Sequence, residues 1–196
     1  MKNILRKIRR TIIILIVIAA LTSLNTIRDS DNFELYRPGF DLDSELQAML
    51  PCCSQELYVG NWGVLRASED ELFAMYCESQ SEENEAFRQL YAKEGMAGLT
   101  DPNCRVIYII QGDDYNAKRA LPHEIGHAAD INHECNGIKP SQTEEFKKIY
   151  EQEAAGYAQM SPEEFFAEVY AGLVSPYDFG LPETPLADEY VSQYVY

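Results

Sequence analysis

The stretch that decides the fold is His123-Glu124-Ile125-Gly126-His127. On a helix, the two histidines are four residues apart and lie one turn apart on the same face. Both imidazoles then reach one metal ion, and Glu124 is placed to hold a water molecule beside it, as in the metal-binding helix of zinc peptidases. The same residues also fit an amphipathic helix with two histidines by chance. All three histidines of the chain, however, lie between positions 123 and 133, which favours a common role.

Such a site needs a third protein ligand, because a catalytic zinc ion takes three and keeps one position for water. One candidate is Glu164, which shares a helix face with Glu168, so that one carboxylate binds the metal and the other supports a histidine. The other candidate is His133, six residues after His127, at the spacing found in metzincins. Asp130 stands where metzincins have a glycine, and it makes the sharp exit turn less readily.

Two motifs together resemble the catalytic domain of anthrax-lethal-factor-like zinc metallopeptidases, whose relatives include secreted Pro-Pro endopeptidases. The motifs are His123-Glu-Ile-Gly-His127-Ala-Ala-Asp130 and, downstream, Tyr157 followed by Glu164-Phe-Phe-Ala-Glu168. The resemblance spans residues 100–175 and implies that Glu164 is the third zinc ligand and that Tyr157 assists catalysis. It also implies an α+β, zincin-like fold with a small mixed sheet, an active-site helix and a C-terminal helical part.

The chemistry predicted from these residues is peptide hydrolysis by a zinc-activated water molecule. Glu124 is the expected base, which takes a proton from the water and passes it to the leaving amine. Tyr157 is expected to donate a hydrogen bond to the oxyanion, unless it is one more buried aromatic residue. Asp130 either orients a ligand histidine or ends the helix. The competing class is an exported module that binds zinc without catalysis.

Apolar periodicity and turn residues predict the remaining elements. We expect the metal helix to begin near Leu121, with Pro122 in its first turn. The best strand is 105–112, and it is a candidate edge for pairing with an extended peptide. The other predicted elements are two strands within 56–66, helices at 43–50, 68–78, 82–94 and 143–155, a helix opened by Ser161, and an irregular tail at 176–196.

The first 28 residues form a separate unit. Six basic and no acidic residues flank an uncharged apolar run at 11–24, which is the order of a secretory signal. The run is also compatible with an N-terminal membrane anchor. We therefore expect a signal peptide or anchor at 1–28, a linker at 29–42 and a zincin-like catalytic domain at 43–196. The domain is expected to be secreted or held at the extracytoplasmic face of the membrane.

Charge and cysteine content limit the partners. Beyond residue 28 the chain carries ten basic and 32 acidic residues, which argues against binding to nucleic acid. A protein or peptide substrate and a monomeric state are the expectations that remain. Five cysteines allow disulfides in an exported protein, and their odd number leaves at least one thiol free or paired with another chain.

Overall fold

The computed structural model describes residues 54–79, 95–177 and 180–195. Its sheet has the strand order β1-β3-β2, in which β1 (Gly63–Ala67) runs parallel and β2 (Gly98–Asp101) antiparallel to β3 (Val106–Ile110). The α-helices are α3 (Ser54–Gly60), α4 (Glu69–Ser79), α6 (Asp114–Asn132), α7 (Glu144–Glu153), α8 (Pro162–Val174) and α9 (Pro185–Val191). The short 3-10 helices are η2 (Pro140–Gln142), η3 (Gly156–Met160) and η4 (Ser192–Tyr194). The α+β class predicted from the sequence is therefore confirmed.

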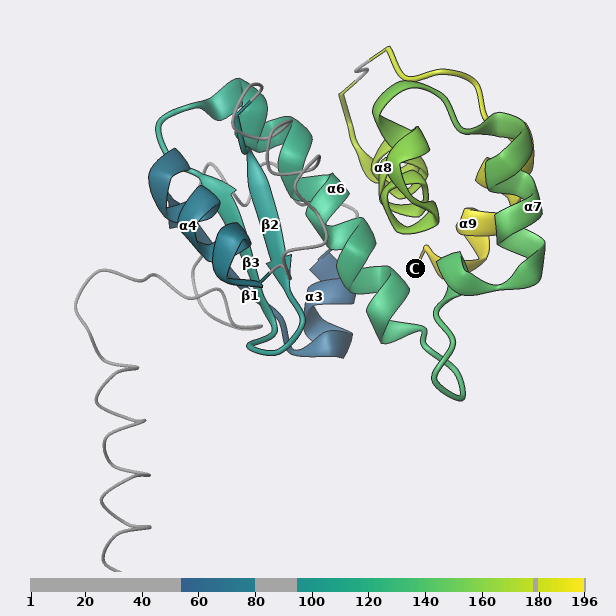
Figure 1. Cartoon of the computed structure of the whole chain (residues 1–196), viewed down its shortest axis with the longest axis horizontal. Coiled ribbons are helices and arrows are strands. Elements are labelled where there is room, and N and C mark those ends of the chain that lie inside the picture. The colour runs from purple at the N-terminus through teal and green to yellow at the C-terminus, as the bar shows by residue number, and fades with distance from the viewer. Residues whose placement is uncertain (1–53, 80–94, 178–179, 196) are drawn as a thin grey trace, which may run out of the picture. The chain divides into compact units, whose positions relative to one another are not determined.

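Helix α6 lies between the sheet and the C-terminal helices, as Figure 1 shows. Side chains of β3 alternate between two apolar clusters. Ile107 and Ile109 are fully buried in the larger cluster, which they share with α6 and α8. Tyr108 packs on the opposite side, in a smaller cluster with Leu72 and Tyr76 of α4. The sheet thus holds α6 from one side, and α8 holds it from the other.

Helix α6 is longer than the sequence pattern predicted. It begins at Asp114 rather than near Leu121, with Asp113 as N-cap, whose side chain accepts a hydrogen bond from the backbone N–H of Asn116. Pro122 is therefore in the helix interior, where proline typically costs about 3 kcal/mol. Burial of Ala117 and Leu121 in the larger cluster offsets this cost, so the proline does not start the helix.

The segment 56–66 does not form two strands. Its first half belongs to helix α3, which packs on α6 with Glu56 and Leu57 buried, and β1 begins after a turn at Asn61. The predicted edge position of the strand at 105–112 is also wrong, because β3 is the central strand. The outer strand beside α6 is β2, which pairs with no strand but β3 among the described residues.

The predicted irregular tail contains helix α9. Thr184 occupies its N-cap position but makes no capping hydrogen bond from its side chain. The Glu153 carboxylate accepts hydrogen bonds from the backbone N–H groups of Leu186 and Ala187 instead. A cap supplied from α7, 33 residues away, leaves no local pattern in the sequence.

Other predicted elements are confirmed. Ser68 and Glu71 form the capping box that opens α4, and the side chain of Thr143 caps α7. The predicted segments 1–28, 29–42, 43–50 and 82–94 lie outside the described residues. Within the described part, Cys104 and Cys135 are free thiols, and no helix is long and apolar enough to span a bilayer.

Candidate metal centre

The middle of α6 carries three polar side chains between residues that belong to the apolar core. His123 and Glu124 are 9% and 8% exposed, while Ile125 is fully buried in the core. His127 follows one turn after His123, and the two imidazole centroids lie 4.9 Å apart with nearly perpendicular rings. The i, i+4 spacing predicted from the sequence is therefore realised on one helical face.

Helix α8 brings the third side chain to this face. Its N-cap is Ser161, whose hydroxyl accepts a hydrogen bond from the Glu164 backbone N–H, and Pro162 occupies the first turn. Glu164 is thereby fixed in the first turn of the helix, with its carboxylate at the histidine pair.

The close approach of α6 and α8 depends on Gly126. A Cβ atom at this position would lie 2.7 Å from the Cα of Ala167 and 2.9 Å from its carbonyl oxygen. Both positions lie within the two motifs, so the small residues of the motifs allow their helices to touch. Sequence reasoning gave Gly126 no role, although a glycine inside a helix costs about 1 kcal/mol relative to alanine and often marks a close contact.

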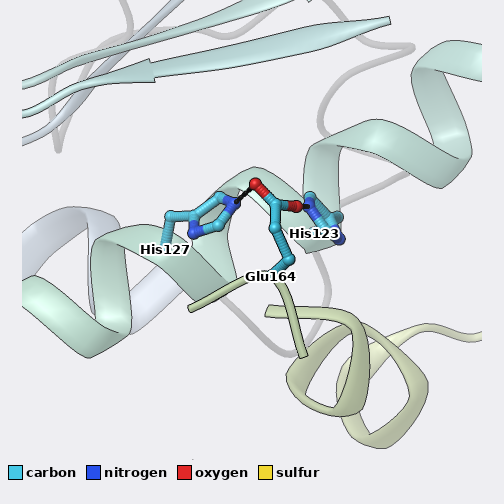
Figure 2. A group of neighbouring side chains, drawn as sticks. All are labelled: His123, His127 and Glu164. Atoms are coloured by element: carbon cyan, nitrogen blue, oxygen red, sulfur yellow. Dashed lines mark hydrogen bonds and ion pairs between the residues drawn. The ribbon is translucent and has the colours of Figure 1, made fainter. Parts of the chain in front are cut away.

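Figure 2 shows the Glu164 carboxylate between the imidazoles of His123 and His127. One carboxylate oxygen lies 3.1 Å from Nε2 of His123, and the other lies 3.6 Å from Nε2 of His127. One ligand atom from each residue lies within 4.8 Å of the other two, so the group could hold a metal ion. The structure thus brings together the predicted ligands His123, His127 and Glu164.

The charges of this group are strongly coupled. Burial lowers the pKa of His123, but hydrogen bonds to Glu164 and Glu168 and the nearby carboxylate charges outweigh burial and raise it to about 10. Burial raises the pKa of Glu164, but the charge of His127 and hydrogen bonds to both histidines hold it well below its usual range. In the metal-free protein, a proton on imidazole therefore balances the carboxylate.

Glu168 supports the histidine pair from the next turn of α8. Its Oε2 lies 2.9 Å from Nδ1 of His123, and its Oε1 lies 3.5 Å from the guanidinium of Arg119. Burial raises the pKa of Glu168, but the hydrogen bond to His123 and the charges of His123 and Arg119 lower it overall. A carboxylate on Nδ1 fixes the ring and leaves Nε2 for a metal, which is the supporting role predicted for Glu168.

A cavity of about 250 Å³ opens beside these residues. Its walls include His123, Glu124, Glu168, Arg119 and Tyr157. Tyr157 is on η3, just before α8, with its ring 6.0 Å from that of His123 and 36% of its surface exposed. Both predicted catalytic residues therefore line the cavity that His123 borders.

Two other predicted residues lie elsewhere. His133 is the C-cap of α6, and its Nε2 lies 3.3 Å from Oε1 of Glu56, away from the group formed with Glu164. Asp130 is 1% exposed and accepts hydrogen bonds from the backbone N–H and the hydroxyl of Ser141. These hydrogen bonds fasten the chain after α6 rather than orienting a histidine.

Thr100 is a second residue that contacts the site and that the sequence analysis did not single out. Its hydroxyl, on strand β2, lies 2.7 Å from Oε2 of Glu124. A threonine in a short strand has no local feature that points to this contact, because the two residues meet only when β2 packs beside α6.

No protein-family model matches the chain, and no curated protein matches it. The resemblance to lethal-factor-like metallopeptidases therefore rests on the two motifs, and their geometry is the basis for a functional proposal.

Proposed function

We propose that the chain is an exported zinc-dependent metalloendopeptidase with a zincin-like catalytic domain. The observation that carries the proposal is the convergence of His123, His127 and Glu164 at one end of a cavity that His123, Glu124 and Tyr157 line. Two imidazoles and a carboxylate are the ligand set of several catalytic zinc sites. Export is proposed from the basic and apolar pattern of residues 1–28.

The ligand spacing supports zinc. Two ligands bound tetrahedrally at about 2.0–2.1 Å from zinc would be about 3.3 Å apart. The two Glu164 oxygens lie 3.1 Å and 3.6 Å from the two Nε2 atoms, and one ligand atom from each of the three residues lies within 4.8 Å of the others, so the side chains would move closer together to hold the ion. When bound, zinc would supply a Lewis acid that polarises the substrate carbonyl and makes a bound water acidic.

Glu124 is the proposed general base. It directly follows His123 on α6, is largely buried, and lines the cavity together with His123. Its carboxylate would accept a proton from the attacking water and return that proton to the leaving amine. Removal of a general base typically slows such a reaction by about 10²- to 10⁴-fold.

Tyr157 is proposed to stabilise the oxyanion. Its ring is beside His123 and lines the cavity, and a phenol there would donate a hydrogen bond to the carbonyl oxygen as negative charge develops. Arg119 and Glu168 balance each other's charge across the same wall.

Substrate would enter along β2 and extend past Tyr157. Among the described residues no strand pairs with the outer edge of β2, so this edge, rather than the strand at 105–112, is the proposed site for an extended peptide. A larger cavity of about 690 Å³ adjoins Tyr157, and its walls combine apolar side chains such as Phe165, Val169 and Leu173 with charged ones such as Arg119 and Glu153. The apolar part of this wall would suit a large apolar substrate side chain near the scissile bond.

The experiment that tests the proposal compares the full-length protein with Glu124→Gln. We expect the wild type to contain about one zinc per chain and to cleave peptides, and the variant to retain zinc but lose turnover by about 10²- to 10⁴-fold. Metal content and cleavage of a quenched fluorescent peptide library are the measurements. Glu134→Gln, at an exposed glutamate just beyond α6, is the matched control. Zinc without cleavage in the wild type would favour a non-catalytic zinc-binding module.

A further inference from the structure

Strand β2 presents a specialised face to α6. Gly98 and Thr100 are two residues apart, so they share one face of the strand, while Leu99 packs on the opposite side with the α4 cluster. On the side of α6, both residues lie against Glu124.

The Thr100 hydroxyl has two acceptors on the same residue. Its Oγ1 lies 2.7 Å from Oε2 of Glu124 and 3.0 Å from the backbone carbonyl oxygen of Glu124. A hydroxyl has one proton to donate, and a charged acceptor makes the stronger hydrogen bond. The shorter contact is therefore the donated one, and it holds one oxygen of the carboxylate.

Gly98 makes room for the other side of the carboxylate. A Cβ atom at this position would lie 2.6 Å from Cγ of Glu124, 2.8 Å from Oε1 and 3.0 Å from Cδ. The carboxylate is thus packed against bare backbone on one side and held by a hydroxyl on the other. The Glu124 side chain has three rotatable bonds, and these two contacts leave it few orientations.

We propose that Thr100 is a positioning residue for the catalytic base, and that Gly98 provides the space this position requires. By donating to Oε2, Thr100 fixes the plane of the Glu124 carboxylate and leaves Oε1 to accept the proton of the attacking water. This role rests on the proposed peptidase function. In this role, a residue of strand β2 orients the Glu124 carboxylate on helix α6.

The decisive variants are Thr100→Val, which keeps the side-chain shape and removes the hydroxyl, and Thr100→Ser, which keeps the hydroxyl. With a cleaved peptide, we expect Thr100→Val to lower kcat by about 10- to 100-fold, with KM and zinc content within about twofold of wild type. Thr100→Ser should retain kcat within about threefold, because the donor remains. A Thr100→Val enzyme with wild-type kcat, or a Thr100→Ser enzyme as slow as Thr100→Val, would overturn the inference.

A second measurement does not depend on turnover. Thermal midpoints of the metal-free protein are compared for wild type, Thr100→Val, Glu124→Ala and the double variant. If the hydroxyl holds the carboxylate, the valine substitution lowers the midpoint more in the chain that has Glu124 than in the chain that has alanine. Equal shifts would show that the contact is absent. Failure of the wild type to cleave any peptide would instead reject the peptidase proposal, and the cycle would still decide the contact.

Discussion

Helix α6 places a histidine against a glutamate at two points along its length. In the middle, His123 contacts Glu164 and Glu168, and His127 lies one turn away. At the end, His133 contacts Glu56, which is 1% exposed. A tyrosine ring lies beside each histidine. The ring centroids are 6.0 Å apart for His123 and Tyr157, and 5.3 Å apart for His133 and Tyr194.

The two places differ in the groups that the glutamate carboxylate contacts. The two oxygens of Glu164 lie toward two imidazole nitrogens, and one ligand atom from each of the three residues lies within 4.8 Å of the other two. The carboxylate of Glu56 instead accepts a hydrogen bond from the Asn132 side chain, which also accepts one from Trp62. Glu56 therefore belongs to a hydrogen-bond network that joins α3, the end of α6 and Trp62, just before β1. A histidine–glutamate contact forms a candidate metal site only where further ligands converge on it.

The largest effect should follow from removing the third ligand. Glu164→Ala deletes the carboxylate that faces both histidines, so we expect loss of stoichiometric zinc and of peptide cleavage. His133→Ala should keep both and lower the free energy of unfolding by about 1–3 kcal/mol, because Glu56 loses a partner. Metal analysis, hydrolysis rates and denaturant unfolding give the comparison. Zinc retained in Glu164→Ala and lost in His133→Ala would instead assign the site to the metzincin arrangement.

Tyr157 and Tyr194, which lie beside His123 and His133, allow a second comparison of the two places. Tyr157→Phe removes only a hydroxyl beside the candidate centre, and loss of one oxyanion donor costs about 100-fold or more in kcat. Tyr194→Phe makes the same change beside His133 and should leave kcat unchanged. Steady-state kinetics with zinc content measured in parallel separates catalysis from metal loss. Equal kinetics for both variants would show that Tyr157 is a structural residue.

Glu168 tests the support of a ligand histidine. Glu168→Gln weakens the hydrogen bond on Nδ1 of His123 and the ion pair with Arg119. We expect zinc affinity to fall by about 10- to 100-fold, as for other residues that orient metal ligands. Competition with a chromophoric chelator measures this affinity. Glu151→Gln, on the exposed side of α7, is the control, and an equal effect there would contradict a specific role for Glu168.

The smallest expected effect is the release of a proton when zinc binds at His123. Because the pKa of His123 is raised to about 10, this imidazole is protonated at pH 8 in the metal-free protein. Zinc must displace that proton, so apparent affinity should increase by about tenfold per pH unit below the pKa. Calorimetry in buffers of different ionisation enthalpy should detect at least one proton released per zinc. The same number is expected for His133→Ala, and binding without proton release would contradict the pairing.

Local patterns predicted much of the scaffold. Ser161 followed by Pro162 predicted the start of α8, and Ser68 with Glu71 predicted the start of α4. The β-branched run predicted β3. These features depend on residues within one turn or strand of each other. The interior position of Pro122 was missed because the local preference for a first turn was outweighed by core contacts.

The sequence by itself determined the histidine pair, the adjacent Glu124 and the two acidic positions of α8, since helical periodicity alone places each set on one face. It left open whether Glu164 or His133 completes the group. In the tertiary structure, Glu164 rather than His133 lies at the histidine pair, because the contact of Gly126 with Ala167 brings α8 against α6 and Glu56 contacts His133. The tertiary structure also placed Thr100 on Glu124. Contacts between separate elements depend on how those elements pack, and spacing along the chain does not encode them locally.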